Sequence, residues 1–497
     1  MIFRRSLLAI VCGFVVLLAV QPAVSDQPKL PDTFAGEQFA EFAQAFNSGS
    51  EEHWRSWILE DPRAADSAEV LERRFGFFKM FYEDLGGFEI TKVGDASEYS
   101  ITALLKAISP QGPFGWVNLT LSYDTAAPHR LLFIDVRPGE DPEDKLPEGD
   151  ITNAALAEYL DNHITELTGK ERFSGAVLIA KDGEPIYTCV VGLASKRFNI
   201  SNKLDTKFNL GSMNKMFTGT AVAQLAQAGK LSFDDPVGMY LPDYPNAEVA
   251  EKVTIHHLLT HTSGIGDYWD ELFNAHWWEI KTVGQLVELA AHKPLEFQPG
   301  ERFGYSNAGP VVLGLIIEKI TGQSYYDYVR QNIYESAGMT STDCYEMDRP
   351  VPNLAIGYTR MNYDGSRSED GWHNNLFMHA AKGGPAGGGF STVEDLLKFD
   401  NALRHHKLLN EEYTNIVTTG KVEMGPDMKY AYLFGDEIAD GHRIVGHNGG
   451  APGISAVLDM YWDSGYTVAV LSNYDNAAGM VARKIGQLLK IKMQQGS

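Results

Sequence analysis

The stretch Asn209-Leu-Gly-Ser-Met-Asn-Lys-Met-Phe217 begins a segment with the apolar spacing of an amphipathic helix, which ends at Gly229. Ser212 stands at the start of this helix and Lys215 follows one turn later, so the lysine amine is expected beside the serine hydroxyl. A serine becomes a good nucleophile when a neighbouring group accepts its proton, and a buried lysine with a lowered pKa can do so. The spacing therefore indicates a nucleophilic serine, although it also occurs by chance and serine is a routine helix cap.

Two further short motifs follow along the chain. Phe303-Gly-Tyr-Ser-Asn307 places a tyrosine 93 residues after Ser212, just before a helical run at 311–320. His447-Asn-Gly-Gly450 comes 142 residues after that tyrosine and precedes a strand pattern. In order and spacing, the three motifs resemble the Ser-x-x-Lys, Tyr-x-Asn and Lys/His-x-Gly motifs of the serine β-lactamase and penicillin-binding protein superfamily, in its β-lactamase-related serine hydrolase branch. The resemblance covers residues 151–497.

This resemblance implies a fold and a role for each matching residue. Ser212 would be the nucleophile that forms an acyl-enzyme, while Lys215 and Tyr305 would share proton transfer, with a Tyr305 phenolate as base. Asn307 would hydrogen-bond an amide or carbonyl group of the substrate. The backbone N–H groups of Ser212 and Gly450 would form the oxyanion hole. The implied fold is α+β: an antiparallel sheet built from both ends of the domain, plus an all-helical subdomain, with no metal and no cofactor.

His447 departs from the lactam-hydrolysing pattern, which usually has lysine at this position. Lysine is a permanent cation that can bind a substrate carboxylate, whereas histidine is mostly neutral above pH ~6.5. We therefore expect a serine hydrolase acting on small-molecule esters or on amide or peptide substrates. A D-alanyl-D-alanine peptidase or a β-lactamase is the alternative among enzymes, and a catalytically silent binding protein is the alternative outside them.

Other residues near these motifs have weaker interpretations. His257 and His261 have the i, i+4 spacing of a metal pair, but the glutamate that zinc proteases place between them is missing, so we predict no metal site. Four aromatic residues cluster in a loop-rich stretch, where they either line the substrate cleft or are ordinary half-buried side chains: Tyr268, Trp269, Trp277 and Trp278.

The first 25 residues have the composition of a signal peptide. Arg4 and Arg5 precede the apolar run 7–20, and Ala23-Val-Ser25 offers small residues before Asp26. The apolar run is short for a membrane span. We expect cleavage, a periplasmic or secreted protein and no stable membrane span afterwards; an uncleaved N-terminal anchor is the alternative.

The segment 138–150 is rich in proline, glycine and acidic residues and predicts an exposed linker between two domains, 26–137 and 151–497. In the first domain, helical spacing gives way to the two-residue alternation of strands in Val117–Tyr123 and Leu132–Val136. Helices followed by a strand meander indicate a small α+β accessory domain. Its element order resembles the cone-shaped fold of the nuclear transport factor two-like superfamily.

Composition excludes several classes of protein. The chain of 497 residues is 44% hydrophobic and 22% charged, which is ordinary for a globular protein. Its net charge of −23 disfavours nucleic-acid and anionic-membrane partners, because phosphate groups would repel it. After removal of the signal peptide only Cys189 and Cys344 remain, and a large core does not need them to pair. Protein partners and oligomeric state are not predictable from these features.

Overall fold

The computed structural model describes residues 28–495, except 66, 110–114, 148, 270, 363–365, 369, 426 and 440. The chain divides into two units, Met1–Asp144 and Lys145–Ser497. The division falls inside the acidic segment 138–150. The predicted signal peptide, residues 1–25, lies outside the described residues.

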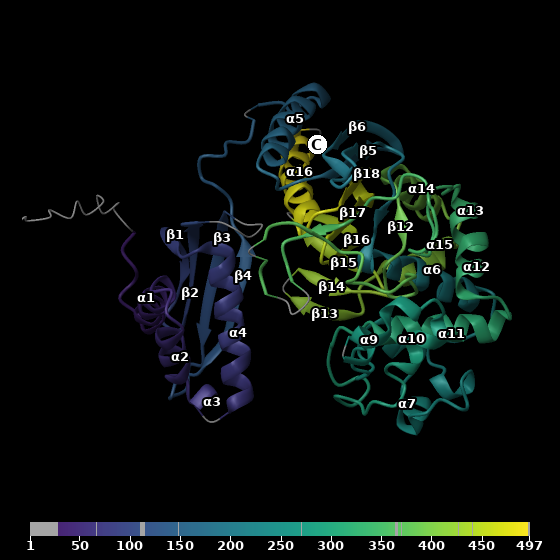
Figure 1. The fold of residues 1–497 in the computed structure, drawn as a ribbon, viewed down its shortest axis with the longest axis horizontal. Helices are drawn as coiled ribbons and strands as arrows, with labels where there is room; N and C mark the ends of the chain where they lie inside the picture. Colours follow the sequence, from purple (N-terminus) through teal and green to yellow (C-terminus); the bar gives the residue numbers. More distant parts are fainter. Residues whose placement is uncertain are drawn as a thin grey trace, which may run out of the picture. The chain divides into compact units, whose positions relative to one another are not determined.

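The first unit is a four-stranded antiparallel sheet, in the order β1-β2-β3-β4, with helices on one face (Figure 1). Its elements are α1 (Phe34–Asn47), α2 (Glu51–Leu59), α3 (Pro62–Ala65), α4 (Ala68–Leu85), β1 (Phe88–Ala96), β2 (Ser100–Ala107), β3 (Trp116–Tyr123) and β4 (Leu131–Pro138). Alternate residues of β3, such as Val117 and Leu119, are buried against Phe42 and Phe46 of α1, because successive side chains of a strand face opposite ways. The likeness to the nuclear transport factor two-like fold stays a prediction.

Strand β4, which contains the predicted stretch Leu132–Val136, is irregular near its start. Leu132 is 51% exposed, whereas its neighbour Leu131 is buried. The pairing of β3 with β4 shifts between Ser122 and Tyr123, whose partners are Phe133 and Leu131. Such a bulge adds one residue to β4 and reverses the facing of the residues before it.

The second unit contains an eight-stranded antiparallel sheet built from both ends of the unit, as the α+β fold class predicted. Its strands, in spatial order, are β13 (Val422–Gly425), β14 (Met428–Tyr430), β15 (Gly435–Ala439), β16 (His442–Ala451), β17 (Ile454–Tyr461), β18 (Tyr466–Ser472), β5 (Gly175–Lys181) and β6 (Glu184–Val191). The early strand β5 pairs with the late strand β18, which closes the sheet across more than 280 residues of chain.

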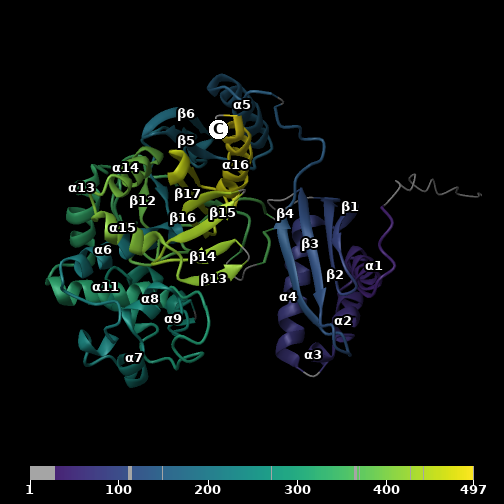
Figure 2. The same cartoon turned by 180° about the vertical axis from the view of Figure 1, so that it is seen from behind.

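Two layers of helices cover this sheet, one on each face. On one face lie α5 (Asn153–Gly169) and α16 (Ala477–Gln495), which run side by side in Figures 1 and 2. Val177 and Ile179 of β5 point into that layer, whereas Ala176 and Leu178 point into the opposite core. Strand β5 is therefore apolar on both faces, which explains its continuous apolar sequence.

The opposite core belongs to the helical part of the unit and contains the nucleophile motif. Helix α6, which the sequence predicted to be amphipathic, is instead buried on almost every side and packs against α11 and α15. The helices of this part are α6 (Asn214–Gln227), α7 (Ala247–Lys252), α8 (Ile255–Leu259), α9 (Glu271–His276), α10 (Val283–Glu288), α11 (Ala308–Thr321), α12 (Tyr325–Val329), α13 (Glu335–Ala337), α14 (Val393–Arg404) and α15 (Glu411–Thr418). Short strand pairs complete the unit: β7 (Leu193–Ser195) with β8 (Ile200–Ser201), β9 (Phe208–Asn209) with β12 (Phe390–Ser391), and β10 (Tyr358–Thr359) with β11 (His373–Asn374).

Within the part of the chain that the structure describes, none of the helices combines the length and apolar composition needed to cross a membrane.

Candidate active site

Ser212 lies in a 3₁₀ turn, Gly211–Met213, that leads directly into α6. Gly211 has φ +51°, a left-handed conformation that glycine adopts without a steric penalty, so the chain can turn sharply just before the helix. Lys215 lies in the first turn of α6 and is completely buried. Its Nζ lies 3.1 Å from Ser212 Oγ. The fold therefore places the amine within hydrogen-bond distance of the hydroxyl.

The other contacts of Lys215 show how its amine is oriented. Nζ also lies 2.7 Å from Asn307 Oδ1 and 2.7 Å from the carbonyl oxygen of Ala386, and both of these oxygens only accept hydrogen bonds. A neutral amine donates its two N–H groups to them and directs its lone pair toward Ser212 Oγ. Burial lowers the pKa of Lys215 to about 7, partly opposed by the negative charge of Asp267. The arrangement is that of a general base for the serine proton.

Asp267 holds Asn307 in this orientation. The Asn307 side-chain Nδ2 donates to Asp267 Oδ2 at 2.7 Å, so its Oδ1 faces Lys215. Asn307 precedes α11, whereas Asp267 lies in the loop after α8, and the two meet only in the folded chain. The first function of Asn307 in this structure is thus to position the amine of Lys215, and one N–H of its amide remains available to a substrate.

Tyr305 lies over Lys215, with Nζ 4.8 Å from the centroid of its ring. Tyr305 is 43% exposed, but the surrounding protein partly desolvates it and raises its pKa to about 12, although a hydrogen bond with Ser212 lowers that pKa. A phenol with this pKa keeps its proton at neutral pH, in contrast to the phenolate that the family resemblance implied. The pKa directions favour Lys215 as the proton acceptor and Tyr305 as a proton donor.

The end of strand β16 forms the opposite wall of the site. A Cβ at Gly449 would collide with the carbonyl oxygen of Leu210, so only glycine lets this strand approach the turn that carries Ser212. Gly450 follows at the same strand end, and a Cβ on Gly211 would lie 3.0 Å from the Gly450 nitrogen. The backbone N–H of Gly450 is therefore close to the nucleophile turn, where an oxyanion hole would need it.

His447 is part of a directional chain of hydrogen bonds. The backbone N–H of Ser306 donates to Nδ1 of buried His261 at 3.3 Å, so the proton of this neutral ring is on Nε2, which lies 3.1 Å from Tyr430 Oη. The Tyr430 hydroxyl in turn lies 3.0 Å from His447 Nε2, and His447 Nδ1 faces the Asn448 carbonyl oxygen. Both ring nitrogens of His447 are thus engaged within the protein.

Both histidine rings in this chain of hydrogen bonds are uncharged at neutral pH. Burial and the nearby charge of Lys215 lower the pKa of His447 to about 4 and the pKa of His261 well below its ordinary value. The ring of His261 also packs against that of Tyr305, with centroids 4.4 Å apart. His261 therefore contacts both Tyr305 and Tyr430, the residue whose hydroxyl meets His447. In this way it positions the side of the site that carries Tyr305 relative to the side that carries His447.

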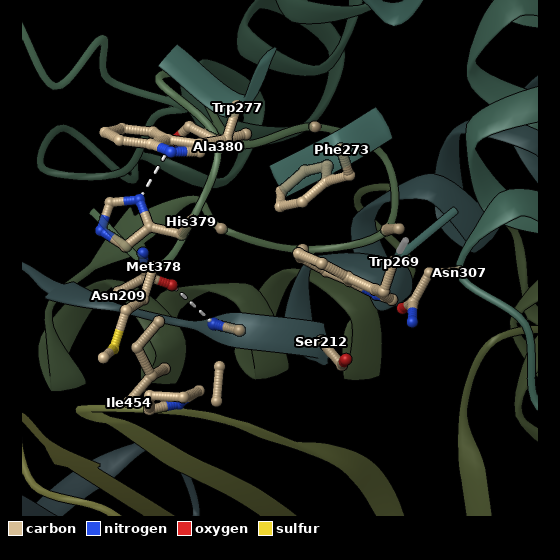
Figure 3. A pocket seen from close by; sticks show the side chains of 18 of the residues that line it. Asn209, Ser212, Trp269, Phe273, Trp277, Asn307, Met378, His379, Ala380 and Ile454 are labelled. Carbon is tan, nitrogen blue, oxygen red and sulfur yellow. Dashed lines mark hydrogen bonds between the residues drawn. The ribbon is translucent and has the colours of Figure 1, made fainter. Parts of the chain in front are cut away.

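Two cavities meet at Ser212. The first, of about 390 Å³, is lined by aromatic and methionine side chains together with asparagine side chains and glycines, and Figure 3 shows Ser212 and Asn307 at its edge. The second, of about 460 Å³, is bordered by Tyr305 and His447 and also by the carboxylates of Glu437 and Asp459. Gly450 borders both cavities. The scissile bond of a substrate at Ser212 would lie between them.

The six residues predicted from the motifs thus surround one point: Ser212, Lys215, Tyr305, Asn307, His447 and Gly450. Sequence reasoning missed Asp267, His261 and Tyr430 as parts of the site. His261 lies in the stretch Leu258–Ile265, which precedes Asp267. Its left-handed φ of +56° is unusual for a residue other than glycine and points to a functional position, but this angle is visible only in the structure. No local pattern singles out Tyr430.

The histidine spacing that could suggest a metal has another explanation. His257 Nδ1 accepts the backbone N–H of Thr254 at 3.2 Å and so caps the start of α8, while His261 faces Tyr430. Among the described residues, no group of three or more His, Cys, Asp or Glu side chains is arranged to hold a metal ion.

Comparison with known proteins places this geometry in context. Residues 160–490 match the Beta-lactamase family model. Penicillin-binding protein 4* of Bacillus subtilis is 31% identical over 330 residues, covering 63% of this chain and 71% of that protein. Esterase EstB of Burkholderia gladioli is 34% identical over 233 residues, covering 44% of this chain and 58% of that protein. A penicillin-binding protein from Bacillus halodurans has a crystal structure that superimposes with a TM-score of 0.60 and 35% identity, covering 66% of this chain and 99% of that one.

Proposed function

This chain belongs to the beta-lactamase family and is a serine hydrolase, and from that premise we propose that it is an exported enzyme that cleaves esters, or related amides, through an acyl-enzyme on Ser212. The observation that carries the proposal is the completely buried Lys215 amine, 3.1 Å from Ser212 Oγ and oriented by two carbonyl oxygens.

In the proposed acylation step, Ser212 Oγ attacks the substrate carbonyl carbon and its proton passes to Lys215 Nζ. The backbone N–H groups of Ser212 and Gly450 receive the oxyanion. As the tetrahedral intermediate collapses, the leaving oxygen or nitrogen takes a proton from the Tyr305 hydroxyl, and Lys215 returns a proton to Tyr305. Water then attacks the acyl carbonyl carbon and gives a proton to the neutral Lys215 amine. Lys215 returns this proton to Ser212 Oγ as the bond between Oγ and the acyl carbon breaks, which releases the acid and restores Ser212.

The test of this mechanism is hydrolysis of p-nitrophenyl butanoate by the purified protein. We expect Ser212→Ala and Lys215→Met to lower kcat/KM by at least about 10³-fold, because nucleophile and base are lost. Ser232→Ala, which truncates an exposed serine outside the site, is the matched control. A fluorophosphonate probe should label Ser212 in the wild type. Labelling of another residue, or full activity of Ser212→Ala, would contradict the mechanism.

A penicillin-hydrolysing or D,D-peptidase activity is the second candidate, favoured by the identity with penicillin-binding protein 4*. Substrates of that kind carry a carboxylate, which needs a cation beside the scissile bond. The cavity next to His447 has no lysine or arginine among its lining residues; it has Glu437 and Asp459 instead, and the lowered pKa keeps His447 neutral. Burial raises the pKa of Glu437 and raises that of Asp459 to about 7, so these groups add at most partial negative charge. Because the described lining offers a substrate carboxylate no cation, the cavity favours esters without a carboxylate.

A substrate panel separates the two candidates. Short-chain esters, a chromogenic cephalosporin and a D-alanyl-D-alanine peptide are compared on the wild type and on His447→Lys. We expect the wild type to prefer the esters and the variant to gain relative activity on the carboxylate-bearing substrates. A wild type that turns over the cephalosporin or the peptide faster than every ester would favour the second candidate.

Export is tested separately. Expression of the full-length chain in a Gram-negative host should give a periplasmic product whose N-terminal sequence begins at Asp26. A product that retains Met1 and stays in the membrane fraction would instead support the uncleaved anchor.

A further inference from the structure

The aromatic part of the cavity beside Ser212, called the apolar cavity below, comes from two segments that lie far apart in the sequence. One is the stretch of Tyr268, Trp269, Phe273 and Trp277 around α9, and the other contains Phe377 and Met378. The ring of Trp269 meets that of Phe273 with centroids 4.4 Å apart, and the ring of Trp277 meets that of Phe377 at 5.7 Å. Figure 3 shows Trp269, Phe273 and Trp277 around the space that opens beside Ser212.

Two of these aromatic side chains remain exposed to solvent. Trp269 is 52% exposed and Phe377 is 59% exposed, which is high for residues that usually bury their rings. Exposed aromatic groups that gather at the mouth of a cavity mark a binding site more often than a solvated surface. The cavity of about 390 Å³ has the size of a site for a small organic group.

The charges around this cavity leave no ionic partner for a ligand. Lys382 carries the formal charge among the described lining residues, and its ammonium lies 3.4 Å from Glu346 and 4.0 Å from the centroid of the Tyr326 ring. His379 also lines the cavity, and burial lowers its pKa, so its ring is neutral. The lining also includes the side-chain amides of Asn209, Asn274 and Asn362, so the group that fits here is uncharged and its apolar part lies against the aromatic rings.

The position of Tyr305 indicates which half of a substrate occupies the cavity. Tyr305 is the proton donor in the proposed mechanism, so the leaving group must reach it. Its side chain borders the second cavity, together with His447, and is not among the residues that line the apolar cavity. The leaving group then lies toward Tyr305, and the acyl group of the substrate extends the other way.

We propose that the apolar cavity is the acyl-binding site and that the enzyme prefers substrates whose acyl group is bulky and apolar, such as phenylacetyl or hexanoyl. This inference rests on the proposed function. Each methylene that leaves water for an apolar site contributes about 0.8 kcal/mol, or about fourfold in kcat/KM when it is bound in the transition state. The acyl preference should rise by about this factor for each methylene until the cavity is filled.

The experiment measures kcat/KM for p-nitrophenyl acetate, butanoate, hexanoate and phenylacetate, so that the leaving group is constant. We expect phenylacetate and hexanoate to exceed acetate by at least about tenfold in the wild type. Trp269→Ala and Phe377→Ala should lower the ratio of phenylacetate to acetate about tenfold. Phe198→Ala is the matched control, because Phe198 is an aromatic residue of the same unit that is 67% exposed and does not line the cavity; it should leave that ratio unchanged.

A second series varies the leaving group, with alkyl acetates of increasing chain length. If Trp269→Ala changes the kcat/KM ratios of the alkyl acetates but not those of the acyl series, the cavity binds the leaving group and the inference is overturned. A flat acyl series, or an equal effect of Phe198→Ala, would also overturn it. If acetate is hydrolysed in a Ser212-dependent way in these cases, the proposed function stands alone; if Ser212→Ala keeps full activity, the proposed function itself has failed.

Discussion

Replacement of Asp267 by asparagine should shift the pH dependence of catalysis toward acid. The Asp267 carboxylate is linked to Lys215 through the Asn307 side chain, by two hydrogen bonds of 2.7 Å. Its negative charge favours the protonated amine and raises the pKa of Lys215, against the larger effect of burial. Asparagine keeps an oxygen that can accept from Asn307, so Asp267→Asn removes the charge while it conserves the shape.

The size of the shift follows from Coulomb's law. One amide group and two hydrogen bonds separate Nζ from the carboxylate by about 6 Å, and an effective dielectric constant between about 20 and 40 gives an interaction of about 1.4 to 2.8 kcal/mol. One pH unit corresponds to about 1.4 kcal/mol. The pKa of Lys215, about 7 in the wild type, should therefore fall by about one to two units in Asp267→Asn.

The assay is the pH profile of kcat/KM for an ester substrate. This profile reports ionisations of the free enzyme, and the reactive form is the neutral amine, so activity should decline below the Lys215 pKa. We expect the acid limb of Asp267→Asn to lie about one to two units lower than that of the wild type. Asp243→Asn, which removes the same charge from an exposed residue, should leave the limb in place. An acid limb that stays unchanged or moves to higher pH in Asp267→Asn would refute the reasoning.

Three further outcomes are expected. Tyr430→Phe removes the hydroxyl that donates a hydrogen bond to neutral His447, so the pKa of His447 should rise from about 4 by about one unit. NMR titration of the histidine nitrogens measures this pKa, and an unchanged value would contradict the direction of the hydrogen bond. Gly449→Ala forces strand β16 away from Leu210, so it should lower ester hydrolysis and also lower the free energy of unfolding by about 1 to 3 kcal/mol, which denaturant melts measure. Gly479→Ala, at an open position of α16, should change neither quantity. Cys344 is buried with its pKa raised to about 12 and should resist thiol reagents until the protein unfolds, after which both free cysteines should react without reductant; a missing thiol would reveal a disulfide.

Local sequence patterns were sufficient to predict much of the fold. The helix predicted after Ser212 is α6, the helical run predicted at 311–320 lies within α11, and the strand predicted at Val117–Tyr123 is β3. These elements were predictable because apolar periodicity records which face of a helix or strand is buried. The bulge near Leu132 was not predictable, because an added residue in a strand depends on how its partner pairs.

The sequence by itself determined the residues of the three motifs and their order along the chain, and it predicted that Ser212 and Lys215 lie one helical turn apart. Only the tertiary structure decided their chemistry. Lys215 has a lowered pKa because segments that lie far along the chain exclude water from it. The same holds for Asp267 and for the aromatic walls of the acyl cavity. Burial, electrostatic fields and cavity shape arise from contacts between distant segments, and the local sequence does not record such contacts.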